Sequence, residues 1–347
     1  MSEATVRQAF AEQAEVCAKL GSEFTGRLCG VLGRVLDQTT ATGRRVLGWR
    51  GPPDALHDNV PLRVTGALHA LVRSGKAPSL ANLYPPAPLP DEARLAEAVA
   101  AVLSEEDSWL EPWLDRTPQT NEVGRSAVLM SGLLAIAECF PLPMRLYELG
   151  ASAGLNLLLD RFGYDLGGLR CGEVDSVVQL RPRWSGGSPP NAEVRIVERG
   201  GVDRDPLDAV RDGDTLLAYV WPDQPERLAR LEAALAIARS DPPHITKADA
   251  ADWIEQNLPA ESERAVARVV QHSIAFQYFP LETQARVRAH IERAAAFARE
   301  DAPLAWLRFE MLPEDAKPSL RLRTWPGEER LLARAHPHGS SVEWLEA

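Results

Sequence analysis

The chain has 347 residues, of which 45% are hydrophobic and 25% are charged, and its formal net charge is −11 at pH 7. These values are ordinary for a globular protein with one large domain or two medium ones. The acidity disfavours nucleic acid as a partner, because phosphate binding requires a basic face. The sequence has no run of 18 apolar residues, and its first ten residues lack the basic start and apolar stretch of a signal peptide. We therefore expect a cytoplasmic protein without a membrane span, and the oligomeric state stays open.

The cysteines and histidines show no metal-ligand spacing. The four cysteines form no C-x-x-C pair, and the seven histidines form no H-x-x-x-H or H-E-x-x-H pattern. We expect reduced thiols and no metal site. His69 lies on the apolar side of an expected helix, where a histidine is usually a packing residue.

The first third of the chain has helical periodicity and no strand pattern. Proline is dense in residues 78–90, which predicts an extended linker. An all-helical N-terminal domain is therefore expected over residues 1–118. Helices are predicted at residues 4–36, with a break at Gly21 and Ser22, and at residues 62–72, 91–103 and 105–115.

A polar segment, Thr120-Asn-Glu-Val-Gly-Arg125, precedes an apolar helix predicted over Ser126–Phe140. Asn121 or Thr120 is a plausible cap for that helix. Alternatively, Asn121, Glu122 and Arg125 bind the substrate, because the helix runs directly into the strand described next. Both interpretations stay open.

The stretch Arg145-Leu-Tyr-Glu-Leu-Gly-Ala-Ser-Ala-Gly-Leu-Asn156 predicts a strand, a tight glycine loop and a helix over Leu155–Phe162. Gly150 and Gly154 allow turn geometry and close approach of the backbone. The N–H groups at the start of the following helix point into the loop, as in nucleotide-type cofactor sites.

Two families share this pattern. Glu148-x-Gly150-x-x-x-Gly154 resembles the first motif of the S-adenosylmethionine-dependent methyltransferases, except that Ser152 stands where many members carry glycine. The resemblance implies that Glu148, Gly150, Ser152, Gly154 and Asn156 hold S-adenosylmethionine. The same residues match G-x-S-x-G, the nucleophile elbow of α/β-hydrolases, with Ser152 as the nucleophile.

Downstream, strand and helix patterns alternate, which predicts a parallel, doubly wound sheet. We expect a Rossmann-like, seven-stranded, methyltransferase-type α/β domain over residues 119–347, with an inserted hairpin region at about 167–212. Strands are predicted at Val194–Val197, Thr215–Val220, 244–249, Ala267–Phe276, Pro303–Met311, Ser319–Thr324 and 331–335, and the last is followed by a polar tail. Helices are predicted at 225–238, 252–257 and 283–297.

Acidic residues after the second and third strands would serve the cofactor under the methyltransferase resemblance. Asp223 follows a predicted strand, and Asp249 follows the next one 26 residues later, which leaves room for one helix. Asp203 also looks like an acid after a strand. We expect Asp223 to bind the ribose, with Asp203 as the alternative and with helix capping as the ordinary role of such aspartates.

The end of the fourth strand carries His272, Gln277 and Tyr278. A methyl acceptor usually lies there in this family, and a histidine or tyrosine can take up its proton. These three residues are the predicted catalytic set. The ordinary alternative is that His272 packs in the sheet and the other two shape a loop.

A serine hydrolase would require several strands and an oxyanion-hole motif before the elbow, and neither is seen. The sequence therefore favours a methyltransferase acting on a small molecule. Alternatives are the hydrolase and a Rossmann-like protein that binds a nucleotide without turnover. The four segments Thr120–Arg125, Glu148–Asn156, Gly201–Pro206 and Trp221–Gln224 together resemble a bacterial family described only as a domain of unknown function. That resemblance implies a bacterial cytoplasmic protein and no particular activity.

Overall fold

The computed structural model describes residues 2–261, 264–312 and 315–346. By contacts within the chain it divides into two units. The helical unit comprises the chain up to Thr120 together with Gly213–Ala229. The sheet unit comprises Asn121–Asp212 and the chain from Arg230 onwards. Among the described residues, no helix is long and apolar enough to cross a membrane.

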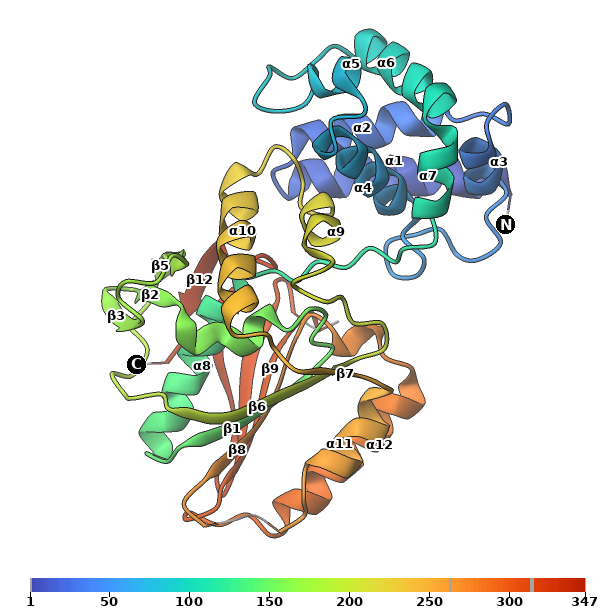
Figure 1. The fold of residues 1–347 in the computed structure, drawn as a ribbon. Helices are drawn as coiled ribbons and strands as arrows, with labels where there is room; N and C mark the ends of the chain where they lie inside the picture. Colours follow the sequence, from blue (N-terminus) through green and yellow to red (C-terminus); the bar gives the residue numbers. More distant parts are fainter. Residues whose placement is uncertain (1, 262–263, 313–314, 347) are drawn as a thin grey trace. The chain divides into compact units, whose positions relative to one another are not determined.

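Only helices precede the first strand in the described part of the chain, as the periodicity predicts (Figure 1). The break at Gly21 and Ser22 is present: the Ser22 hydroxyl accepts the Thr25 N–H and begins the second helix. The segment rich in proline contains a short helix instead of being extended throughout. The helices are α1 (Glu3–Lys19), α2 (Glu23–Val35), α3 (Ala41–Leu47), α4 (Val60–Arg73), α5 (Pro78–Ala81), α6 (Glu92–Glu105) and α7 (Asp107–Trp113). Their apolar faces share one core, which includes Phe10, Phe24, Leu32, Leu68 and Leu95.

The prediction of a strand at residues 215–220 is wrong, because Gly213–Ala218 forms helix α9. A short apolar run fits a buried strand and a buried helix equally well, so periodicity alone does not distinguish them. Here α9 packs on α4 within the helical unit. A Cβ on Gly66 of α4 would lie 2.6 Å from the Tyr219 ring, so the following turn is closely packed as well. Helix α10 (Pro225–Ser240) comes next and begins at proline, as predicted.

The sheet unit has a nine-stranded sheet in the order β5-β12-β11-β10-β9-β8-β1-β6-β7. The five strands from β9 to β7 are parallel, whereas β10, β11 and β12 add an antiparallel meander. The strands are β1 (Met144–Leu149), β5 (Arg183–Ser185), β6 (Ile196–Asp203), β7 (Ile245–Lys247), β8 (Ala267–Ser273), β9 (Leu304–Glu310), β10 (Ser319–Trp325), β11 (Glu329–Ala335) and β12 (Ser341–Trp344).

The strand count differs from the predicted seven for two reasons. The expected polar tail contains β12, whose Val342 and Trp344 are buried. The insert supplies β5, which pairs with β12. The start of the insert and the residues just before it also form a separate three-stranded sheet, β3-β2-β4. Its strands are β2 (Gly163–Leu166), β3 (Leu169–Gly172) and β4 (Gln179–Leu180).

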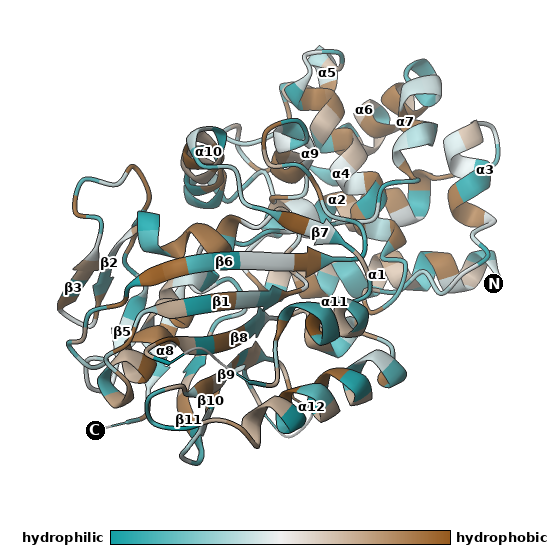
Figure 2. Cartoon of the chain, turned by 60° about the horizontal axis from the view of Figure 1, so that its bottom comes forward, coloured by the Kyte–Doolittle hydropathy of each residue, from teal (hydrophilic) through white to brown (hydrophobic). Residues whose placement is uncertain are grey.

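Helices cover both faces of the large sheet. Helix α8 (Arg125–Cys139) packs on β9 and β10, while α11 (Ala250–Asn257) and α12 (Leu281–Ala295) pack against each other on the opposite face (Figures 1 and 2). Figure 2 shows the strands of the sheet lying side by side, and α12 carries both hydrophilic and hydrophobic residues. Because strand side chains alternate, Tyr147 and Leu149 join the core under α11 and α12, whereas Glu148 lies on the α8 face.

Candidate functional site

The parallel strands are arranged third-second-first-fourth-fifth in chain order, reading β7-β6-β1-β8-β9. The chain therefore leaves β1 toward β6 on one side and later returns to β8 on the other. In open parallel sheets, ligands bind outside the carboxyl ends of the strands at such a switch point. The glycine loop follows β1 at this point.

The two loop glycines are required by backbone geometry. Gly150 and Gly154 have φ angles of +69° and +75°, which disfavour any residue with a Cβ. A Cβ on Gly150 would lie 2.5 Å from the Ala275 Cβ, and one on Gly154 would lie 2.6 Å from Ile245. Ser152 also has a positive φ, +54°. The glycines thus let neighbouring segments of the chain close tightly around the loop.

Most of the N–H groups in the loop are bonded within the protein. Gly150 and Ala151 donate to the Val202 carbonyl at 2.9 and 3.0 Å, and Ser152 donates to Asp203 Oδ2 at 2.8 Å. Leu155 N–H donates to Asn121 Oδ1 at 2.7 Å. The expected helix after the loop is a 3₁₀ helix, η1 (Leu155–Arg161). These bonds hold the loop in one shape before any ligand binds.

Glu148 is the buried acid of the site. It lies next to the end of β1, is 2% exposed and pairs in register with Gln271 of β8. Glu148 Oε2 and both amide atoms of Gln271 are buried and make no hydrogen bond to the described residues. Burial raises the pKa of Glu148 to about 8; the neighbouring Gln271 amide and the charge of Arg125 lower it in part, and the charge of Asp203 raises it.

Asp203, rather than Asp223, stands beside the loop. Asp203 ends β6, the strand that pairs with β1, and its two carboxylate oxygens accept the N–H groups of Ser152 and Asp205. Asp223 belongs to the helical unit, where its carboxylate accepts hydrogen bonds from the Ser22 hydroxyl and the Phe24 N–H at the start of α2. The spacing argument for Asp223 depended on a strand that the structure replaces with α9.

Asp249 has the ordinary capping role. It follows β7 as predicted, its Oδ1 accepts the Ala251 N–H at the start of α11, and its Oδ2 accepts the Thr283 hydroxyl at 2.9 Å. Both oxygens are therefore used to join the two helices that cover one face of the sheet.

The polar segment before α8 contacts the glycine loop through Asn121. Asn121 bonds to the loop backbone, as described above, and the Ser126 hydroxyl donates to Asn156 Oδ1 at 2.7 Å. Arg125 donates to the carbonyl oxygens of Ser273 and Pro337, both at 2.9 Å, and its charge acts on Glu148. Glu122 Oε1 accepts the Gly124 N–H and lies 3.6 Å from Arg230. The expectation that this segment faces the loop thus has a structural basis, whereas its substrate role stays a prediction.

His272 is buried in the sheet with both ring nitrogens engaged. Nε2 accepts the indole N–H of Trp306 at 3.1 Å, so the ring proton lies on Nδ1 and is donated to Glu310 Oε1 at 2.6 Å. The same Glu310 oxygen accepts the N–H groups of Ala275 and Phe276. This network positions the turn after β8. A neutral His272 with these bonds has no nitrogen available for a substrate proton.

That turn carries the other two residues of the predicted catalytic set. The 3₁₀ helix η2 (Phe276–Tyr278) contains exposed Gln277 and Tyr278, and Tyr278 is 52% exposed. Phe279 follows η2 and lies 5.4 Å from Phe276, ring centre to ring centre. A Cβ on Gly150 would lie 3.4 Å from the Phe279 ring, so η2 and the glycine loop are neighbours.

An open groove of about 430 Å³ lies beside the loop. This volume is within the range of small-molecule sites. The groove is lined by Ala153, residues 206–212, Pro242, Pro243 and Ile245. This lining is mostly apolar, and its charged residues are Asp208, Arg211 and Asp212.

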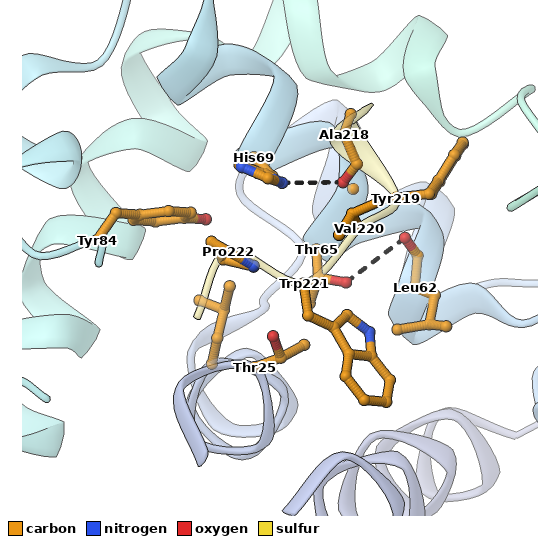
Figure 3. A pocket seen from close by; sticks show the side chains of 12 residues that line it. Thr25, Leu62, Thr65, His69, Tyr84, Ala218, Tyr219, Val220, Trp221 and Pro222 are labelled. Carbon is orange, nitrogen blue, oxygen red and sulfur yellow. Dashed lines mark hydrogen bonds between the residues drawn. The ribbon is translucent and has the colours of Figure 1, made fainter. Parts of the chain in front are cut away.

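A second cavity, in the helical unit, is too small for a substrate. It has room for about one water molecule, about 10 Å³, and His69, Tyr84 and Thr25 point into it (Figure 3). His69 Nδ1 lies 3.1 Å from the Ala218 carbonyl oxygen, and burial lowers the histidine pKa to about 4. His69 is a neutral packing residue, as expected from its place on an apolar helix face.

Two residues beside the predicted ones were absent from the predicted set. Gln271 lies next to His272 in β8 and pairs in register with Glu148, and its polar side chain in a predicted strand was visible in the sequence. Glu310 ends β9, but its role depends on contact with a strand about 38 residues earlier. Sequence spacing carries no signal for that contact.

The chain belongs to a bacterial family described as "Uncharacterized protein conserved in bacteria (DUF2332)", whose model matches residues 7–344. This confirms the expected membership in a bacterial family of unknown function. No curated protein and no solved structure shows significant similarity to the chain.

Proposed function

We propose that the sheet unit binds S-adenosylmethionine at the carboxyl ends of β1 and β6 and methylates a small molecule. The observation that carries this proposal is Glu148. Its Oε2 is buried without a hydrogen bond to the described residues, at the switch point of the parallel sheet. A buried carboxyl oxygen without a hydrogen-bond partner costs stability, so a hydrogen-donating ligand group there would relieve the cost.

Asp203 is the residue that we assign to the ribose. Each of its carboxylate oxygens accepts one backbone N–H, and a carboxylate has about four acceptor positions. Its side chain is half-buried, so the remaining positions can accept ribose hydroxyls. The groove beside Ala153 would take the nucleoside. Asp223 and Asp249 are assigned to helix capping instead.

S-adenosylmethionine supplies a methyl group activated by a sulfonium. The protein would hold this cofactor against the preformed glycine loop, and proximity accounts for much of the rate of such a displacement. Gln277 and Tyr278 would line the acceptor side, with the Tyr278 hydroxyl available to the acceptor's proton. Arg125 and Asn121 would support the loop, and the His272–Glu310 pair would fix η2.

Thermal melting tests the cofactor. S-adenosylmethionine or S-adenosylhomocysteine at about 100 times its dissociation constant should add roughly 2.7 kcal/mol of stability. Glu148→Gln should reduce this shift, whereas Arg286→Gln, on the surface of α12, should leave it unchanged. No shift with either compound would reject the proposal. A shift with NAD alone would instead support a nucleotide-binding protein.

The serine hydrolase is the second candidate, and Ser152 in G-x-S-x-G is its basis. Its elbow normally follows several strands, whereas only helices precede β1 in the described chain. His272 is not available as the base, because both of its nitrogens are engaged. A fluorophosphonate that labels the wild type but not Ser152→Ala would establish the hydrolase.

A further inference from the structure

One exposed arginine next to η2 has no acidic partner among the residues that the structure describes. Arg288 of α12 lies with its guanidinium carbon 4.9 Å from the Phe276 ring centre and 5.6 Å from that of Trp306. Within residues 2–261, 264–312 and 315–346, no carboxylate forms an ion pair with it. By contrast, Arg286 on the same helix pairs with Asp252 and Glu255, both at 2.7 Å.

Arg288 donates no hydrogen bond to the described residues, so its N–H groups are available to a ligand. A guanidinium over an aromatic ring uses its face for the contact, while its N–H donors lie in the plane of the group. Those donors form a fork that matches a carboxylate or phosphate. Phe276 and Trp306 lie 6.0 Å apart, ring centre to ring centre, and form the apolar support beneath the charge.

Another arginine of this cluster, Arg308, differs from Arg288 because it has an acidic partner. Arg308 also lies over the Trp306 ring, 4.7 Å from its centre, and forms an ion pair with Glu329. Burial lowers the pKa of Arg308, and the charges of Arg288 and Arg321 lower it further. Glu329 and Asp315 pair with Arg308 and Arg321, respectively, whereas Arg288 forms no ion pair with any carboxylate in the described part of the chain.

The cluster is connected to the glycine loop. Phe276 contacts Phe279, and Phe279 packs beside Gly150. Gln277 and Tyr278, the exposed residues of η2, lie between these two rings in the chain. Arg288 therefore lies beside the same turn, η2, that neighbours the glycine loop.

We propose that Arg288 binds an anionic group of the methyl acceptor, so that the substrate is a carboxylate or phosphate compound with an apolar or aromatic body. The identification of the bound anion as a methyl acceptor rests on the proposed function. The anion site itself does not require the cofactor, so the two are tested separately.

Benzoate is the probe, and benzamide is its neutral counterpart of similar shape. Isothermal titration of the full-length protein should show millimolar binding of benzoate and at least tenfold weaker binding of benzamide. Inorganic phosphate distinguishes a phosphate site from a carboxylate site. Arg288→Gln should weaken benzoate at least tenfold. Arg286→Gln, the matched control on the same helix, should leave benzoate binding unchanged.

The outcomes separate the two proposals. Benzoate binding that depends on Arg288 without any response to S-adenosylmethionine would reject the methyltransferase and keep the anion site. Equal binding of benzoate by wild type and Arg288→Gln, or equal binding of benzoate and benzamide, would overturn the anion site. Melting temperatures of the two variants show whether a loss reflects folding, and Arg288→Lys should retain part of the benzoate affinity.

Discussion

Replacing Glu148 with glutamine tests whether this carboxyl group is buried in its neutral form. The substitution keeps the size of the side chain and removes its titration. The folded-state pKa is about 8, against 4.5 for an unperturbed glutamate, and burial is the main cause. The other titrating groups are common to both proteins, so they largely cancel in the comparison.

The sign of the effect follows from the raised pKa. Between about pH 4.5 and pH 8 the folded wild type holds a proton on Glu148, whereas the unfolded chain has released it. Wild-type stability therefore falls as the pH rises through this range. The difference between the two pKa values corresponds to about 5 kcal/mol at 1.36 kcal/mol per pKa unit. Glu148→Gln lacks this loss, so its stability relative to wild type should rise by about 5 kcal/mol from pH 4.5 to pH 9.

Urea denaturation of both proteins at pH 4.5, 7 and 9 measures the difference, with hydrogen exchange of β1 amides reporting on the strand itself. The two stabilities should be closest at the lowest pH and diverge steadily above it. A difference that stays constant within about 1 kcal/mol over this range would show that Glu148 is ionised in the folded state, and the reasoning from burial would be refuted.

Five further substitutions test the geometry of the site and of the helical unit. Gly150→Ala should destabilise the protein by about 3 kcal/mol in urea melts, since a clash adds to the positive φ, whereas Gly168→Ala, in open space, should cost about 1–2 kcal/mol; equal losses would contradict the packing. Asp223→Asn should lower stability by about 1–2 kcal/mol and leave cofactor affinity intact. Asp203→Asn should instead lower cofactor affinity in calorimetry and largely keep the stability. If Asp223→Asn lowered the affinity and Asp203→Asn did not, the sequence-based assignment of Asp223 to the ribose would be restored. Tyr84→Phe, which removes a buried hydroxyl without a hydrogen bond to the described residues, should be neutral or stabilising by about 1 kcal/mol; a loss of more than about 1 kcal/mol would reveal a partner.

Local chemistry in the sequence was enough to predict the glycine loop and the helices of the first third. Gly150 and Gly154 have positive φ angles, which glycine adopts readily. The break at Ser22 arises because the Ser22 side chain caps α2 by accepting the N–H of Thr25. Such features depend on neighbours in the chain, so they can be read without the fold.

Tertiary structure decided which acids meet the loop. Asp203 stands there because β6 pairs with β1, while Asp223 caps α2 in the helical unit. Strand pairing joins residues about 50 positions apart, and a short apolar run such as Thr215–Val220 can form a helix or a strand with the same hydrophobic pattern.

The same limit applies to His272. Its sequence position suggested a base at the end of a strand, but the structure places Glu310 and Trp306 on its two nitrogens. Residue type and spacing from one sequence predict where a site can form. Which donors and acceptors remain available in it is decided by long-range contacts, because hydrogen-bonding capacity is consumed by whichever segments fold against each other.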